Sequence, residues 1–385
     1  MIFTLEVFKA RYGEAFLLHF GELQDRRVVL IDGGPRGSYD AVLRPRLEQL
    51  RHQRGGELDL DLVVIGHSDE DHYHGFLELT DEFLAADRED EPVAYVIDEL
   101  WYNDVDELIG QHGELLLRSA RAELAAKGGG SLSHRAALLL ASELPARRLV
   151  QNVEQLGLHR NRGDSLVTDR LGSHPLAHGL ELRVLAPRDE QVDALQQEWD
   201  AEVARRGAAE AEKGRAHATV YLDESLGPLA SLVLVAELDG KRMLLAGDAS
   251  GDELLDALQA GGLLEASSSV HFELIKLPQH GAAEVGATGL LERVTADHYV
   301  ISADGKHGRP GAATLERLAA AASRRGEPAN LWMVASIGEL AAHWPEAEKA
   351  ELARVRELLE GFAAPTSPIR LRTIGSNKSS VEVAL

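Results

Sequence analysis

The sequence predicts an α/β fold in which strands alternate with helices. Two observations lead to this prediction. Short apolar runs of about four to eight residues recur along the chain, and segments with helical periodicity separate many of them. The chain has 385 residues, of which 44% are hydrophobic. This is enough for one large domain, or for one domain with an appendage.

The first part of the chain predicts the order β-β-β-α-β. The strands are expected at residues 2–8, 15–20, 27–32 and 62–65, and the helix at 40–53. Gly33, Gly34 and Pro35 stop the third strand. Asp32 ends that strand, where it either caps the turn or supports the residues that follow the next strand. The start of the helix is left open, because Pro45 fits only in a first helical turn.

The middle of the chain predicts an inserted helical region. A helix is expected at 77–89 and a strand at 93–97. From about 106 to 157 the pattern is helical, broken by three glycines at 128–130 that predict a mobile turn. A strand at 180–187 ends at Pro187, and a charged helix at 189–213 follows it.

The second half of the chain predicts a further set of strands and helices. Residues 231–238 and 241–246 predict a hairpin, because Asp239 and Gly240 between them are a strong two-residue turn signal. Helices are expected at 251–260, 312–324 and about 346–361, and strands at 273–277, 298–302, 330–335, 369–373 and 380–384.

The strongest chemical signal lies in residues 62–76, LVVIGHSDEDHYHGF. Five ionisable side chains follow a predicted strand within six residues: His67, Asp69, Glu70, Asp71 and His72. Carboxylates and imidazoles packed so closely repel or desolvate one another unless a cation lies between them. We therefore predict a metal site in the loop after this strand. The alternative is an acidic surface loop with two chance histidines.

Polar groups also follow three later strands. Asp248 follows the hairpin, His280 follows the strand at 273–277, and a loop at 304–309 follows the strand at 298–302. Each signal is weak alone, because aspartate is common in turns. Their joint occurrence is stronger, because strand ends at one edge of a sheet sandwich are where sites are assembled.

Composition excludes several classes of protein. The net charge of −23 argues against broad electrostatic binding to nucleic acid, although a local basic groove or a metal-mediated phosphate site remains compatible with it. The chain has no cysteine, so any metal must take His, Asp or Glu ligands. No signal peptide, membrane span or glycine-rich nucleotide loop is recognisable. We expect a cytoplasmic protein without membrane contact or organic cofactor.

These patterns together resemble the metallo-β-lactamase fold superfamily, and within it the hydrolase domain of ComEC-type DNA-uptake proteins. The matching stretches are GEAFLLHF, RRVVLIDGGP, VVIGHSDEDHYHG, LRVLAP, SLVLVAELDGKRMLLAGD, LIKLPQHGA and YVISADGKHGRPGAATLERL. The resemblance implies a four-layer αββα sandwich with a helical insertion at about 104–178. It implies a hydrolase domain over residues 1–340, with a C-terminal helix and short strands at 341–385 packing on it.

The resemblance also implies two positions for divalent metal ions. The implied ligands are His67 and Asp69 at the first position, Asp71, His72 and His280 at the second, and Asp248 as a bridge. A further histidine usually precedes the hairpin in such proteins. Residues 225–231 lack it, and His217 is the nearest upstream substitute. Zn²⁺ or Mn²⁺ is expected, with Mg²⁺ as an alternative, because the ligands are rich in oxygen.

A basic loop completes the expected site. Lys306, His307 and Arg309 cluster in an otherwise acidic chain, where they either bind a substrate phosphate or are simply solvated. In the first case His307 would act as a general acid, and Asp71 would orient or deprotonate the attacking water.

Three further side chains lie near the predicted ligands in the sequence. Gln279 would be a hydrogen-bonding neighbour of the site, and Glu70 is expected to be solvated. His74 is expected either to support the ligands or to be exposed to solvent.

The function expected from the sequence is metal-dependent hydrolysis through a metal-activated water. A phosphodiesterase or nuclease acting on nucleic acid or a nucleotide is favoured. One alternative is a hydrolase of a lactam, lactone or thioester bond, because the fold alone does not separate these reactions. Another is a catalytically weak metal-binding subunit of a multi-protein system, whose helical insertion binds a protein partner.

Overall fold

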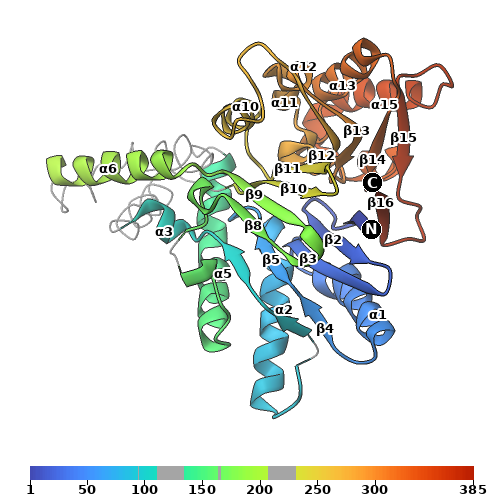
Figure 1. Ribbon diagram of the computed structural model, residues 1–385. Helices are drawn as coiled ribbons and strands as arrows, with labels where there is room; N and C mark the ends of the chain where they lie inside the picture. Colours follow the sequence, from blue (N-terminus) through green and yellow to red (C-terminus); the bar gives the residue numbers. More distant parts are fainter. Residues whose placement is uncertain (94, 111–133, 164–165, 207–230) are drawn as a thin grey trace.

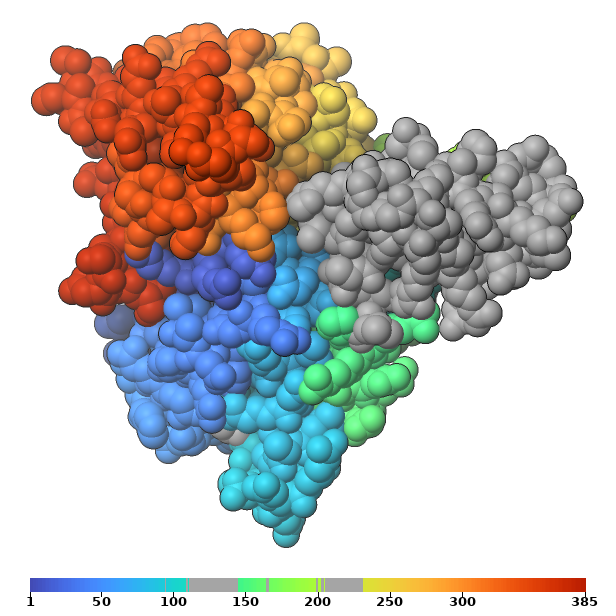
Figure 2. Space-filling model, turned by 180° about the vertical axis from the view of Figure 1, so that it is seen from behind, coloured from blue at the N-terminus to red at the C-terminus, as the bar shows by residue number. Residues whose placement is uncertain are grey.

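The computed structural model describes residues 1–93, 95–110, 134–163, 166–206 and 231–385. Two large β-sheets face each other, and helices cover the outer face of each one (Figure 1). The predicted four-layer αββα sandwich is therefore confirmed. In the space-filling view, surface from the first hundred residues meets surface from the C-terminal third across the middle of the molecule (Figure 2).

The first sheet has the strand order β16-β1-β2-β3-β5-β7. Its strands are β1 Ile2–Phe8, β2 Ala15–Glu22, β3 Asp25–Gly33, β5 Leu62–Ile65, β7 Leu100–Tyr102 and β16 Ser380–Ala384. The strands β1, β2 and β3 are antiparallel, whereas β5 and β7 continue the sheet in parallel to β3. Two short strands, β4 Leu58–Leu60 and β6 Tyr95–Ile97, form a separate parallel pair.

Successive residues of the first sheet face opposite sides. In β5, Leu62 and Val64 belong to the core between the two sheets, whereas Val63 and Ile65 belong to the core under the outer helices. This follows from the two-residue repeat of a strand. Because both faces of β5 are buried, its sequence is continuously apolar rather than alternating.

The helices on the first sheet lie in the regions where the sequence predicts them. They are η1 Tyr39–Leu43, α1 Arg44–Arg54, α2 Glu70–Arg88 and α5 His134–Gln155. The helix α2 begins at Glu70, seven residues before its predicted start. The helix expected at 40–53 is wrong in one respect, because its first turn is π-helical and α1 starts only at Arg44. Pro45 lies in the first turn of α1, where its missing N–H leaves no helical hydrogen bond unmade. The helix α5 packs on α2, where Asn152 Nδ2 donates to Thr80 Oγ1 at 3.0 Å.

The second sheet has the strand order β15-β14-β13-β12-β11-β10-β9-β8. Its strands are β8 Ser173–Pro175, β9 Glu181–Ala186, β10 Val233–Leu238, β11 Lys241–Leu245, β12 Val270–Lys276, β13 Val294–Ile301, β14 Ala329–Met333 and β15 Ile369–Thr373. The predicted hairpin β10–β11 is confirmed. Asp239 (φ 52°) and Gly240 (φ 76°) both have the positive φ that its two-residue turn requires.

The helices of the second half follow the parallel strands of the second sheet. They are α10 Gly251–Ala260, α11 Ala283–Ala287, α12 Leu290–Arg293, α13 Ala312–Arg325, α14 Ile337–His343 and α15 Lys349–Gly361. The strands β11 to β15 run parallel to one another, so their carboxyl ends lie at the same edge of the sheet. The last two strands belong to different sheets, because β15 extends the second sheet and β16 pairs with β1 in the first. The two chain ends consequently lie close together (Figure 1).

The inserted region is helical only in part. Its described residues include α3 Val105–Ile109 and α5, but residues 156–163 and 166–178 contain short 3-10 turns and strand β8 and no α-helix. The charged helix is α6 Asp189–Arg206, which extends away from the sheets in Figure 1. The predicted glycine turn at 128–130 and His217 lie outside the described residues. In the described part of the chain, no helix is both long and apolar enough to cross a membrane.

Candidate metal centre

The acidic, histidine-rich stretch changes from strand to helix within a few residues. The strand β5 ends at Ile65, Asp69 is the N-cap of α2, and Asp71 and His72 lie in its first turn. The prediction that this stretch forms a loop is therefore wrong beyond Asp69. The physical reason is that carboxylates next to a helix N-terminus stabilise it, so the sequence starts a helix there.

The first turn of α2 is held against the ends of β2 and β3. The backbone N–H of Gly34 donates to His72 O at 3.1 Å, and that of Gly75 donates to Gly34 O at 2.9 Å. A Cβ on Gly75 would lie 2.0 Å from the carbonyl oxygen of Gly33, so only glycine permits this approach. Close backbone packing thus fixes where Asp71 and His72 point.

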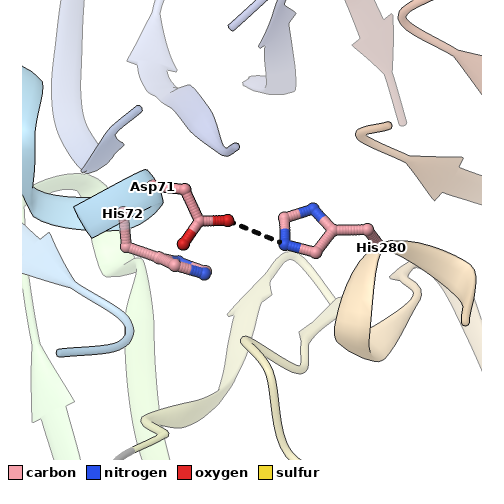
Figure 3. Close-up of side chains that lie close together, drawn as sticks. All are labelled: Asp71, His72 and His280. Carbon is pink, nitrogen blue, oxygen red and sulfur yellow. Dashed lines mark ion pairs between the residues drawn. The ribbon is translucent and has the colours of Figure 1, made fainter. Parts of the chain in front are cut away.

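Four predicted ligands from three distant segments meet at one point. His280 Nε2 lies 3.3 Å from Asp71 Oδ2 and 3.6 Å from Asp248 Oδ1, and His72 Nε2 lies 3.7 Å from Asp248 Oδ1. Figure 3 shows Asp71 and His72 from the start of α2 facing His280 from the turn after β12. Metal bonds of about 2.0–2.2 Å in a tetrahedral site separate neighbouring ligand atoms by roughly 3.3–3.6 Å. The observed spacing is thus close to that of a divalent cation's ligands.

The two histidines of this group are held in the tautomer that a metal needs. His72 Nδ1 lies 3.0 Å from Asp32 Oδ2, and His280 Nδ1 donates to the carbonyl oxygen of Ser302 at 2.7 Å. Both Nδ1 atoms therefore carry the hydrogen, and each Nε2 presents its lone pair to the site. Neither Nε2 atom has a hydrogen-bond partner among the described residues, which fits atoms that bind a metal.

A β-bulge directs Asp32 toward this site. Ala15 pairs with Gly33 and Phe16 with Ile31, so Asp32 is an extra residue in β3, with a left-handed φ of 58°. One carboxylate oxygen accepts from the backbone N–H of Gly66 at 2.6 Å, and the other faces His72. Asp32 thus links the ends of β3 and β5 to His72, which is a predicted metal ligand. It also ends its own strand, as the sequence suggested.

The electrostatic field of the group favours positive charge. Burial alone would lower the pKa of His72, but the carboxylates of Asp32 and Asp71 outweigh it and raise that pKa well above its usual range. Burial would raise the pKa of Asp248, but the imidazoles of His280 and His72 hold it well below its usual range. Protons on the imidazoles would satisfy this field. A metal cation at the same point would replace them.

The two residues of the first predicted metal position are close to this group. His67 and Asp69 are buried, with His67 Nδ1 3.5 Å from Asp69 Oδ2, and the rings of His67 and His72 are 5.3 Å apart. His67 Nδ1 accepts from the backbone N–H of Asp69 at 3.1 Å, so a metal would have to be bound through Nε2. Within the described ranges, the groups of three close ligand atoms include neither residue. The second position is thus better defined than the first.

The structure adds two residues to the site that the sequence did not single out. Glu14, just before β2, and Lys276, at the end of β12, are each 1% exposed and form an ion pair beside His280 and Asp248. Burial raises the pKa of Glu14, and the nearby ammonium group of Lys276 opposes that shift. A lysine within the apolar run at 274–277 was the available signal, because a buried lysine requires a partner.

A pocket of about 160 Å³ opens over the metal ligands. One part of its wall consists of ligands, among them Asp69, Asp71 and Asp248, and another part of the basic loop. The lining residues from outside the ligand set are Tyr12, Glu70, Gln279, Lys306, His307 and Arg309. The structure thus brings the predicted basic loop and Gln279 to the same cavity as the metal ligands.

Tyr12 arranges the mouth of this pocket. Lys306 Nζ lies 3.2 Å from the centre of the Tyr12 ring, and the His307 ring meets Tyr12 edge-on with its centre 6.3 Å away. The hydroxyl group of Tyr12 donates to Glu70 Oε2 at 3.0 Å. These contacts orient part of the basic loop, which a purely solvated loop would not require.

The structure corrects the expectation for Glu70 and excludes one of the two alternatives for His74. Glu70 is not simply solvated, because its second carboxylate oxygen accepts from the backbone N–H of Arg36 at 3.1 Å, in addition to the bond from Tyr12. His74 is only 5% exposed, and its Nε2 accepts from Arg36 Nε at 3.3 Å. The helical geometry of α2 explains both outcomes, because residues 70 and 74 lie one turn apart on one face.

Another cluster of a histidine and carboxylates lies away from this pocket. Glu6, His19 and Glu382 come together in the first sheet. Arg46 Nε donates to both carboxylate oxygens of Glu6 at 3.0 Å, and His19 Nε2 is 2.8 Å from Glu6 Oε2. The guanidinium group already supplies the positive charge here, so this cluster is an ion-pair network.

Comparison with known family models gives a match to part of the chain. Residues 12–151 match the family model described as the metallo-beta-lactamase superfamily. The matched region contains His67, Asp69, Asp71 and His72, and the four-layer architecture agrees with that fold. The finer resemblance to the ComEC-type branch stays a prediction.

Comparisons over the whole chain add little. No curated protein matches it. A solved structure of a protein of unknown function from Enterococcus faecalis V583 shares 9% identity, with a TM-score of 0.27. That similarity covers 97% of this chain and 78% of the other.

Proposed function

We propose that this chain, whose residues 12–151 match the metallo-beta-lactamase superfamily model, is a metal-dependent hydrolase of phosphodiester bonds in a nucleic acid or nucleotide. The observation that carries the proposal is the composition of the pocket. Metal ligands such as Asp71 and Asp248 share one cavity with Lys306, His307 and Arg309. A substrate that approaches both walls must offer oxygen to a cation and negative charge to basic side chains, as a phosphodiester does.

The charges around the site support two divalent ions. Five buried or half-buried carboxylates lie at or directly behind the candidate ligand atoms, together with the buried ammonium group of Lys276. The carboxylates are those of Glu14, Asp32, Asp69, Asp71 and Asp248. With neutral imidazoles this leaves four negative charges, which two divalent cations would neutralise. The oxygen-rich ligands suit Mn²⁺ or Zn²⁺, with Mg²⁺ as the alternative.

The protein's own groups have distinct roles in the proposed reaction. A divalent cation bound at the site would lower the pKa of a water molecule and polarise the phosphoryl oxygen. Asp71, at the pocket wall, orients the attacking water and takes up its proton. Lys306 and Arg309 bind the non-bridging phosphate oxygens. His307, which is exposed at the pocket mouth, donates a proton to the leaving oxygen.

The basic loop has capacity for a substrate anion. Among the residues that the structure describes, no carboxylate forms an ion pair with Lys306 or Arg309. The surrounding charge is strongly negative, at −23 for the whole chain. A long duplex would meet repulsion outside the pocket, so a short or single-stranded substrate fits better.

The test is a hydrolysis assay with Mn²⁺, Mg²⁺ and Zn²⁺ in turn. Substrates are bis(p-nitrophenyl) phosphate and short single-stranded DNA and RNA, and the variants are Asp71→Ala and His72→Ala. We expect metal-dependent cleavage by the wild type and its loss in both variants. His52→Ala is the matched control, because the side chain of His52 is 72% exposed and lies far from the pocket in the α1 helix. Cleavage that survives both substitutions would remove these residues from the active site.

The basic loop allows the substrate class to be tested separately. If Lys306 and Arg309 bind phosphate, replacing either by alanine lowers kcat/KM for a phosphodiester by about 10- to 100-fold, the usual effect of losing a charged hydrogen bond. Hydrolysis of an uncharged lactone or thioester would hardly change. If the wild type prefers such a neutral substrate, the alternative hydrolase is correct. If it binds metal and cleaves none of these substrates, the metal-binding subunit is the better description.

A further inference from the structure

Lys276 is a lysine whose surroundings are unusual for its residue type. Its side chain is 1% exposed, at the carboxyl end of β12. An ammonium group in such a position must be paired and hydrogen-bonded, because its desolvation is otherwise very unfavourable. Its Nζ atom donates to the carbonyl oxygen of Gly247 at 2.7 Å, forms an ion pair with Glu14, and lies 3.9 Å from Asp248 Oδ1.

These contacts join three separate segments behind the metal ligands. Glu14 precedes β2, Gly247 and Asp248 follow β11, and Lys276 ends β12. The carboxylate of Glu14 also lies 3.3 Å from His280 Nδ1, on the side of the ring away from the metal site. The ammonium group is therefore linked to the backbone before one ligand and, through Glu14, to the ring of another.

The ammonium group occupies a place where a cation would otherwise be favoured. Glu14, Asp248 and His280 each offer a ligand atom, and these atoms lie within 4.8 Å of one another. Lys276 contacts two of the three residues. Asp248 Oδ1 in turn lies 3.7 Å from His72 Nε2 and 3.6 Å from His280 Nε2.

We propose that Lys276 is a positioning residue of the metal centre, and that its pair with Glu14 sets where Asp248 and His280 present their ligand atoms. The inference rests on the metal centre in the proposed function. The chain before Asp248 lies close to the segment that precedes β10, because a Cβ on Gly247 would lie 3.0 Å from Leu232 O. The lysine fixes the chain there through the carbonyl oxygen of Gly247.

Positioning and simple charge compensation predict different results. Removing the ammonium group alone makes the site more negative by one charge, so Coulomb attraction would strengthen cation binding. Removing it together with the Glu14 carboxylate leaves the charge unchanged, so Coulomb attraction predicts unchanged binding. If the lysine positions ligands, its removal weakens binding despite the extra negative charge. Loss of residues that orient metal ligands typically weakens metal affinity by about 10- to 100-fold.

The experiment compares Lys276→Met with the double variant Glu14→Gln/Lys276→Met. The single variant leaves the carboxylate of Glu14 buried without its partner and is open to folding defects. The double variant removes both charges and avoids this problem. Lys349→Met is the control for the loss of one positive charge, because Lys349 is exposed on α15. Calorimetric titration with Mn²⁺ and Zn²⁺ gives the dissociation constant, and the melting temperature of the metal-free protein reports folding.

We expect the folded double variant to bind either metal about 10- to 100-fold more weakly than the wild type, and the Lys349 variant to bind normally. Unchanged or tighter binding by the double variant would overturn the positioning role while leaving the proposed function intact. A wild type that binds neither metal would overturn the proposed function, and this inference with it. A lower melting temperature with unchanged affinity would show a structural role alone, and would also overturn the inference.

Discussion

Several residues of the candidate site have a backbone conformation that side chains other than glycine rarely adopt. Asp32, Gln279, His280 and His307 have φ values of 58°, 49°, 53° and 62°. Such conformations are unfavourable in isolation and concentrate at functional sites, where the surrounding structure holds them. The residue types of the site were predictable from the sequence. Their directions were not, because these depend on local backbone geometry that no periodicity encodes.

The Asp32 carboxylate can be tested with a substitution that keeps the bulge. Asparagine tolerates a left-handed backbone, so Asp32→Asn should fold, but it loses the charge that holds the Nδ1 hydrogen of His72. We expect Mn²⁺ and Zn²⁺ to bind about 10- to 100-fold more weakly in calorimetric titrations. Asp90→Asn is the matched control, because Asp90 also has a positive φ, 56°, but is exposed at the end of α2. Equal affinities in the two variants would contradict a role for Asp32.

Asp104 predicts a pH dependence of stability. Burial, with the nearby charge of Asp106, raises the pKa of its carboxyl from 3.8 to about 6. A raised pKa means that the folded protein prefers the protonated form. This contribution to stability is therefore complete below pH 3.8 and is lost as pH rises through about 6.

Asp104→Asn should remove the loss of stability that the buried carboxyl causes as pH rises. Asparagine is an equally good N-cap for α3, where Asp104 now accepts from the N–H of Asp106 at 3.2 Å. The variant should be more stable than the wild type at pH 7 to 8, by at most on the order of 3 kcal/mol, and the gain should shrink toward pH 4. Urea unfolding at several pH values measures this. A difference that does not vary with pH would refute the assignment.

At the scale of elements, α2 depends on close packing of its backbone against β3. Gly75→Ala would place a methyl group 2.0 Å from the carbonyl oxygen of Gly33, so the helix start must shift. Asp71 and His72 would move with it. We expect a lower melting temperature and weaker metal binding in this variant.

Gly338→Ala is the matched control for that substitution. Gly338 is a helical glycine of α14 with nothing within 4 Å of an added Cβ. Alanine there should be neutral, or stabilising by about 0.4–1 kcal/mol. If both alanine variants behaved alike, close packing would not be what places α2.

The elements that could be predicted from the sequence are those with a strong periodic or turn signal. The strands β5, β15 and β16, the helix α10 and the turn of the β10–β11 hairpin lie where the sequence predicts them. The missed strands β4, β7 and β8 have only three residues each, too few to show a repeat. The short helices α11, α12 and α14 were not predicted for the same reason. Their positions depend on packing against the second sheet, which is not a local property.

At the scale of the whole molecule, the candidate metal centre lies between the two halves of the sandwich. Asp71 and His72 belong to the side of the first sheet, whereas Asp248 and His280 follow strands of the second. The backbone N–H of Leu232 donates to Gly66 O at 2.8 Å, which also links the two sheets at this edge. A cation bound by both halves stabilises the folded state, because the unfolded chain does not hold its ligands together.

Metal addition should therefore raise the melting temperature of the protein. At a free metal concentration about 100 times the dissociation constant, linkage predicts a gain of about 2.7 kcal/mol. EDTA should reverse the effect. His280→Ala should abolish it, whereas the exposed-histidine variant His52→Ala should retain it. A shift of equal size in the His280 variant would mean that the metal binds elsewhere.

The sequence predicted the ligand types of the second metal position, but only the three-dimensional arrangement relates them to the rest of the site. The order of strand ends indicated that residues 67–72, Asp248 and His280 would meet, since parallel strands end at one edge. Glu14 and Lys276 were not predicted, because each looks like an ordinary charged residue beside a strand. Their pairing joins positions 262 residues apart, and that distance is visible only in the fold.

The central claim is that Asp71, His72, Asp248 and His280 together bind a divalent cation. Anomalous X-ray diffraction from crystals soaked in Mn²⁺ or Zn²⁺ tests it most directly. The claim predicts an anomalous peak among these four side chains, at about 2.0–2.2 Å from the ligand atoms. The absence of a peak there, or a peak only at another cluster such as Glu6, His19 and Glu382, would contradict it.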